Sequence, residues 1–104
     1  MNARKELERI LEYNNSKIVC ADIQLDPYSV NHEVASSKRL KLGYSEEEYS
    51  KFMESLDFEY DAGYGMQELS GIVWLENGWL ERGEYDGSEW WAFKTRPEIP
   101  DFLH

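Results

Sequence analysis

Residues 68–94, ELSGIVWLENGWLERGEYDGSEWWAFK, decide the fold class of this 104-residue chain. The segment contains two dipeptides, Asn77-Gly78 and Asp86-Gly87, that are typical of two-residue hairpin loops. Both suit type I′ turns, whose two central residues have positive φ. The runs between them are rich in aromatic and aliphatic side chains, as β-strands are. We therefore predict a three-stranded antiparallel meander, with strands at roughly 68–76, 79–85 and 88–95.

The two turns also predict which side chains share a face of the meander, because side chains alternate between the faces of a strand. The first turn pairs Leu75 with Leu80. The second pairs Gly83 with Trp90, whose ring can cover a bare strand glycine. One face then holds a mainly aliphatic set that is predicted to be the core, namely Leu69, Val73, Leu75, Leu80, Trp91 and Phe93, with Arg82 near Trp91. The other face holds Ile72, Trp74, Trp79, Tyr85 and Trp90, with Glu81 and Gly83 between them.

The remaining sequence supplies two helices and two further strands. Alternating apolar residues predict antiparallel strands at 17–25, with Val19, Ala21, Ile23 and Leu25 on one face, and at 38–44, with Leu40, Leu42 and Tyr44 on one face. Apolar residues at helical spacing predict helices at 2–13 and 45–57. The order αββαβββ predicts a single α+β domain over residues 1–104, with helices on one face of a mostly antiparallel sheet.

The helix at 45–57 has the clearest pattern of the two. Ser45 is followed three residues later by Glu48, which is the capping-box arrangement. The apolar residues Tyr49, Phe52, Met53 and Leu56 then form one stripe, which we expect to pack on the aliphatic face of the meander.

The negative charge of the chain is concentrated in one segment. Residues 1–45 contain seven Lys/Arg and six Asp/Glu, a net charge of +1. Residues 46–89 contain two Lys/Arg and thirteen Asp/Glu, a net charge of −11, whereas the whole chain has a net charge of −10. Such a field disfavours direct binding to nucleic acid or a membrane surface and favours basic partners or cations. Solubility alone is the simpler interpretation of the same charge.

The sequence contains neither the pattern of an export signal nor that of a membrane-spanning segment. The first residues lack an apolar signal core, and no stretch approaches the roughly 20 apolar residues of a membrane span. Cys20 is the only cysteine, so an internal disulfide is excluded and a reducing compartment is expected. We therefore predict a cytoplasmic protein.

Catalytic signatures are absent from the sequence. The histidines are His32 and the last residue, His104, and Cys20 has no basic neighbour in the sequence that would activate it as a nucleophile. There is no glycine-rich phosphate loop, nucleophile elbow or His/Cys metal spacing. We expect a protein that is not an enzyme and that uses no cofactor.

One acidic stretch partly matches a calcium-binding loop. DFEYDAGYGMQE (57–68) places Asp57, Glu59, Asp61 and Glu68 at loop positions 1, 3, 5 and 12. However, position 6 is Ala62 instead of glycine, and a strand is predicted to follow where the calcium motif has a helix. An acidic connection into the meander is the simpler interpretation.

The C-terminal block GIVWLENGWLERGEYDGSEWWAFKTRPEIP resembles the C-terminal part of short, acidic, uncharacterised phage and prophage proteins. The resemblance covers roughly the last 40 residues. It implies a setting in which small acidic proteins bind and inhibit host enzymes, including nucleases, and it assigns no catalytic residues.

The second aromatic face of the meander is the predicted binding surface. It must be covered by the N-terminal helix, the tail, a second copy of the chain, or a ligand or partner. We predict a binding protein that engages a basic surface of a partner protein, such as a nucleic-acid enzyme that it inhibits by mimicking nucleic acid. The expected binding residues are Trp74, Trp79, Trp90, Glu81, Glu84, Asp86 and Glu89. The alternative is a small-ligand or calcium-binding module that combines the tryptophans with the carboxylates of residues 57–68.

Overall fold

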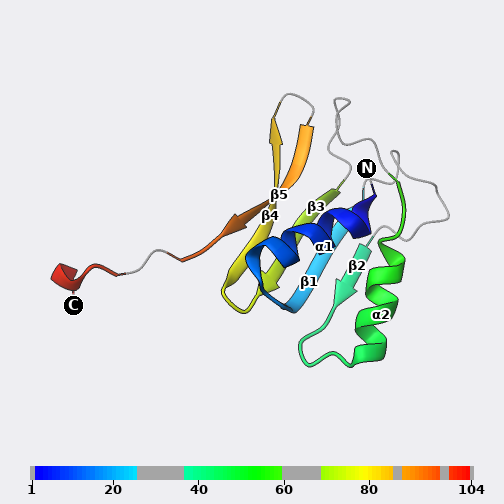
Figure 1. Cartoon of the computed structure of the whole chain (residues 1–104), viewed down its shortest axis with the longest axis horizontal. Coiled ribbons are helices and arrows are strands. Elements are labelled where there is room, and N and C mark those ends of the chain that lie inside the picture. Colours follow the sequence, from blue (N-terminus) through cyan, green and yellow to red (C-terminus); the bar gives the residue numbers. More distant parts are fainter. Residues whose placement is uncertain (1, 26–36, 60–68, 86–87, 97–98, 104) are drawn as a thin grey trace.

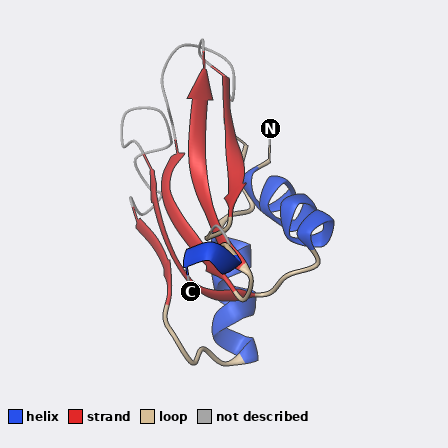
Figure 2. Ribbon diagram, turned by 90° about the vertical axis from the view of Figure 1, so that its left-hand side faces the viewer, coloured by secondary structure: helices blue, strands red, loops and turns tan. Residues whose placement is uncertain are grey.

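The computed structural model describes residues 2–25, 37–59, 69–85, 88–96 and 99–103. They form one small α+β domain in which two helices lie on the same side of a five-stranded sheet (Figure 1 and Figure 2). In chain order the elements are α1 (Ala3–Asn14), β1 (Ile18–Leu25), β2 (Ser37–Leu40), α2 (Glu46–Ser55), β3 (Leu69–Leu75), β4 (Gly78–Tyr85), β5 (Ser88–Lys94) and the 3₁₀ turn η1 (Asp101–Leu103). The predicted fold class and the order αββαβββ are confirmed.

The sheet has the strand order β2-β1-β3-β4-β5, and all neighbouring strands are antiparallel. The predicted pairing of the first two strands and the predicted meander are both present. They are joined in the middle of the sheet, where β1 pairs with β3 from Ile18↔Leu75 to Leu25↔Leu69. The edge strands are therefore β2 and β5. After β5 the chain leaves the sheet as a tail that extends away from the domain (Figure 1).

The core fills the space between the helices and one face of the sheet. The predicted face of the meander is confirmed, since Leu69, Val73, Leu75, Leu80 and Trp91 are buried and Phe93 packs against them. The helices contribute Leu7 and Leu11 from α1 and Phe52, Met53 and Leu56 at α2. The predicted position of α2 over the meander is wrong, because α2 lies beside β2, at the edge of the sheet away from β4 and β5 (Figure 1).

Helix α2 begins with the predicted capping box. The Ser45 hydroxyl accepts a hydrogen bond from the Glu48 amide at 3.1 Å, and the Glu48 carboxylate accepts one from the Ser45 amide at 3.3 Å. Each side chain satisfies an amide that has no partner within the helix. The acidic first turn, Glu46 to Glu48, lies where the helix dipole favours negative charge.

Two strand predictions are wrong in detail. Strand β2 ends at Leu40, and Leu42 is 72% exposed instead of facing the core, because the chain turns at Gly43 with φ of 73°. In β1 the register shifts between Ile18 and Cys20, so that Ile18 is buried and Val19 is only partly buried. An extra residue at a β-bulge reverses the alternation on one side of it, which explains the error at Val19.

The first hairpin turns one residue earlier than its sequence signal indicates. Leu75 pairs with Gly78, so the two-residue loop is Glu76-Asn77. Asn15 is the one non-glycine residue with positive φ in the described part of the chain, so Asn77 does not adopt the predicted type I′ conformation. Gly78 is instead required inside β4, because a Cβ there would lie 2.3 Å from the Lys94 carbonyl oxygen. The second hairpin has the predicted register, from Leu80↔Phe93 to Gly83↔Trp90.

Candidate functional site

The side of the sheet opposite the helices carries the predicted aromatic surface. We call it the aromatic face and define it by Ile72, Trp74, Trp79 and Trp90. Trp74 pairs with Trp79 across β3 and β4, and Ile72 pairs with Glu81 in the next row. Trp74 and Trp90 are each 42% exposed, and Ile72 and Trp79 are partly buried. Figure 2 shows both helices on the other side of the sheet, so neither covers this face.

Trp90 has the predicted contact with the glycine opposite it. A Cβ built on Gly83 would lie 2.7 Å from Cε2 and 2.8 Å from Nε1 of Trp90, so the indole lies directly against the Gly83 backbone. Trp90 also borders a hollow of about 390 Å³ at the edge of the sheet, but the other residues that line it, Tyr13 and Ile10 among them, belong to the helix side. The exposed indole is therefore held by the sheet on one side and open to an approaching group on the other.

The charged side chains next to the aromatic face are of both signs. Glu81 accepts a hydrogen bond from the Trp79 indole at 2.6 Å, which fixes the orientation of that ring. Farther along the same row, Asp22 of β1 accepts a hydrogen bond from Arg39 of β2 at 3.2 Å. Glu81 thus occupies the predicted position beside the tryptophans.

The prediction for Glu89 is wrong, because this carboxylate is inside the domain. Glu89 is 4% exposed and forms an ion pair with Arg82 at 2.5 Å. Its carboxylate also accepts a hydrogen bond from the Leu69 amide at 3.1 Å. Arg82 in turn contacts Glu6 of α1 at 2.9 Å and lies 4.8 Å from the centre of the Trp91 ring. Arg82 and Glu89 need each other because a buried charge is tolerated only when it is paired.

Strand alternation contains the signal that would have placed Glu89 correctly. It lies two residues before Trp91 on the same strand, and Arg82 pairs with Trp91, so all three side chains share the core face. Of the remaining predicted binding residues, Glu84 pairs with Glu89 through the backbone, and its side chain lies outside what the structure describes. Asp86 lies outside the described residues altogether.

The described carboxylates of the acidic segment 46–89 do not lie on one surface. Glu46, Glu47, Glu48 and Glu54 are exposed on α2, on the helix side of the sheet. Glu81 lies on the opposite side, and Glu89 is buried between the two layers, as described above. The charge and the aromatic residues coincide in the sequence, but among the described residues they are largely separated.

The two described carboxylates of the predicted calcium loop bind the N-terminus of α1. The side-chain amide of Asn2 donates to Asp57 at 2.9 Å and to Glu59 at 3.3 Å. Asp61 and Glu68 lie outside the described residues. Within the described ranges no group of three or more His, Cys, Asp or Glu side chains is arranged to hold a metal ion.

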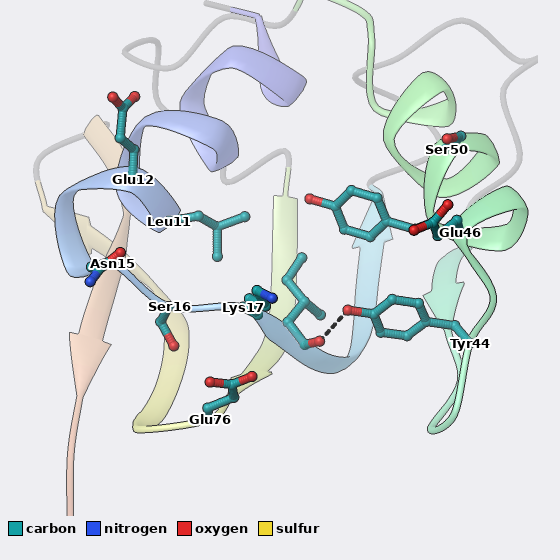
Figure 3. A pocket seen from close by; sticks show the side chains of 11 residues that line it. Leu11, Glu12, Asn15, Ser16, Lys17, Tyr44, Glu46, Ser50 and Glu76 are labelled. Atoms are coloured by element: carbon teal, nitrogen blue, oxygen red, sulfur yellow. Dashed lines mark hydrogen bonds between the residues drawn. The ribbon is translucent and has the colours of Figure 1, made fainter.

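A second candidate site, which the sequence did not suggest, is a cleft of about 770 Å³ on the helix side (Figure 3). It lies where the end of α1, the start of β1 and the start of α2 meet. Tyr44 and Tyr49 stack in it, with ring centres 5.7 Å apart and an angle of 24° between the planes. The Tyr44 hydroxyl donates a hydrogen bond to the Ile18 carbonyl. The cleft is lined by Leu11, Glu12, Asn15, Ser16, Lys17, Ile18, Tyr44, Glu46, Tyr49, Ser50 and Glu76.

The two tyrosines of the cleft stay protonated over a wider pH range than free tyrosine. Burial raises the pKa of Tyr44 above its ordinary value of 10.0, and Tyr49 and Glu76 raise it further. Burial also raises the pKa of Tyr49, with a further contribution from Glu8, while Arg4 lowers it. Both rings are therefore neutral aromatic surfaces at neutral pH.

Comparison with known proteins adds no assignment. No protein-family model matches the chain, and neither a curated protein nor a solved structure matches it. The resemblance of the C-terminal block to phage-type proteins therefore stays a prediction. Neither helix in the described part of the chain has the length and apolar content needed to cross a membrane.

Proposed function

We propose that this protein is a non-enzymatic binding protein that attaches to a basic surface of a partner protein through its aromatic face. The observation that carries the proposal is the exposure of Trp74 and Trp90, each 42%, on a side of the sheet that neither helix covers. Tryptophan is among the residues that contribute most to binding energy at protein interfaces.

The arrangement of the aromatic face favours binding without large rearrangement. Trp90 lies against Gly83 and Trp79 is held by Glu81, so both rings are oriented before a partner arrives. A pre-oriented side chain loses less conformational entropy on binding than a free one.

The charge of the chain supports the choice of a basic partner. The net charge is −10, and charges on both sides of a small domain contribute to the field that steers an approaching protein. In this proposal the carboxylates of α2 accelerate association, whereas the tryptophans provide the contact that persists. The resemblance to phage-type proteins favours a nucleic-acid enzyme as the partner, inhibited by occupation of its phosphate-binding surface.

The test is capture of a partner from a cell lysate by the full chain, compared among matched variants. Trp74→Ala and Trp90→Ala should each lose the partner, whereas Tyr13→Ala, which removes an 86% exposed ring from α1, should retain it. Binding should weaken in high salt, because charges beyond roughly 10 Å are screened at 0.1 M. Heparin should displace a partner that binds through a phosphate site. Equal capture by all variants, independent of salt, would contradict the proposal.

A further inference from the structure

The cleft beside the two tyrosines has a composition that selects for one class of ligand. Its charged side chains are Glu12, Glu46, Glu76 and Lys17, so carboxylates outnumber the single cation. None of the three carboxylates forms an ion pair with any residue in the ranges that the structure describes. Unpaired carboxylates around a concave surface attract a cation and repel an anion.

The aromatic side chains of the cleft indicate more closely which cations it can bind. Tyr44 is fixed by its hydrogen bond to Ile18 and by its stacking on Tyr49. Tyr49 is partly buried, and it lines the same cleft together with Leu11. Neutral aromatic rings attract organic cations through their π faces and offer an apolar surface to the chain that carries the charge.

The wall also contains an unused hydrogen-bonding group. The Ser16 hydroxyl oxygen is buried and has no hydrogen-bond partner among the described residues. Such groups are uncommon in folded proteins. In Figure 3 this hydroxyl points toward the side of the cleft occupied by Glu76.

We propose that this cleft binds an organic cation, a guanidinium or ammonium group on a short apolar chain, between the Tyr49 ring and the carboxylates of Glu46 and Glu76. A compact metal ion fits less well, because no cluster of three metal-binding side chains exists in the described part of the chain. The volume of about 770 Å³ lies within the range of small-ligand sites, roughly 300–1,000 Å³. The cleft is on the helix side of the sheet, so the inference does not depend on the function proposed for the aromatic face.

The first experiment titrates the isotope-labelled full chain with N-acetyl-arginine amide and with its neutral isostere, N-acetyl-citrulline amide. The backbone amide resonances of Ser16, Lys17 and Tyr49 report on the cleft. The arginine compound should give saturable shifts at these positions, and the citrulline compound should bind about tenfold more weakly because charge-assisted hydrogen bonds are lost. A parallel titration with n-butylguanidine, which carries the same single charge without a peptide backbone, distinguishes the sources of the cation: tighter binding than the capped arginine assigns a free small molecule, and weaker binding assigns a peptide side chain.

The second experiment repeats the arginine titration on variants that remove the same unit of charge. Glu46→Gln and Glu76→Gln should each weaken binding about threefold, as expected for one partly exposed charge pair. Glu54→Gln is the matched control, because Glu54 lies on the same helix as Glu46 but outside the cleft. All three residues are exposed, so the fold should persist. The proposal is overturned by an absence of saturable shifts, by equal binding of the two capped compounds, or by an equal effect of all three variants.

Discussion

The indole ring of Trp90 packs directly against the backbone of Gly83. A β-carbon on this glycine would lie 2.7 Å from Cε2 of the ring and would overlap it. The two residues are direct partners across β4 and β5. Trp90 is nevertheless 42% exposed, because only one side of the ring faces the sheet. The same side chain thus covers a strand glycine and presents an aromatic surface to a partner, and these two roles can be separated experimentally.

Replacing Gly83 with alanine should displace the Trp90 ring and lower the free energy of unfolding by about 1–2 kcal/mol, as steric overlap in a packed site does. In a Trp90→Ala background the same substitution should be neutral or stabilising, because alanine restricts the unfolded chain more than glycine does. Urea denaturation of the four proteins in this cycle measures both effects. Additive free energies would show that the ring does not rest on Gly83.

Arg82 should be far more important for stability than an arginine in an exposed ion pair. Arg82→Ala leaves Glu89 and Glu6 inside the domain without their cation, which should cost about 3–5 kcal/mol. Arg4→Ala is the control, because the pair of Arg4 with Glu8, at 2.7 Å, lies at the surface and should contribute less than about 1 kcal/mol. Equal losses in thermal or chemical denaturation would contradict a buried, desolvated Arg82–Glu89 pair.

Phe52 tests the packing of α2 on the sheet. It is 5% exposed in the layer between the helices and the strands, and Phe52→Ala should lower the free energy of unfolding by about 3–5 kcal/mol. Tyr13→Ala removes an aromatic ring of similar size that is 86% exposed, and it should change stability by less than about 0.5 kcal/mol. A loss below about 1 kcal/mol for Phe52→Ala would rule out this packing.

The faces of the meander were predictable from the sequence because they depend only on alternation along each strand. In the first hairpin Leu80 pairs with Val73, although the turn signal indicates Leu75. This shift of two residues moves no side chain to the other face. The Asn77-Gly78 signal reports turn propensity, whereas the position of Gly78 is set by the close approach of the Lys94 carbonyl, a contact between distant residues.

The features that the sequence did not reveal depend on three-dimensional neighbours. The bulge near Cys20 fits β1 to β3, and a single strand read on its own gives no sign of it. The apolar pattern groups Tyr44 and Tyr49 with the core residues, and both rings do pack against the core. The pattern does not show where α1 ends relative to α2. The cleft exists because that relative placement leaves the tyrosine pair partly uncovered.

Tyr44 should make stability depend on pH in the alkaline range. Its pKa is raised in the folded protein, first by burial and then by Tyr49 and Glu76, so the folded state holds the phenolic proton more tightly than the unfolded state does. Its contribution to stability is therefore fully present below the unfolded pKa of about 10 and is lost as the pH rises through the higher folded pKa.

The measurement is urea denaturation between pH 9 and pH 11.5. The free energy of unfolding should decline less over this range in Tyr44→Phe than in the wild-type chain. Tyr13→Phe is the control, because Tyr13 is 86% exposed, and its decline should follow that of the wild type. Parallel curves for all three proteins would mean that the Tyr44 phenol is not desolvated by folding.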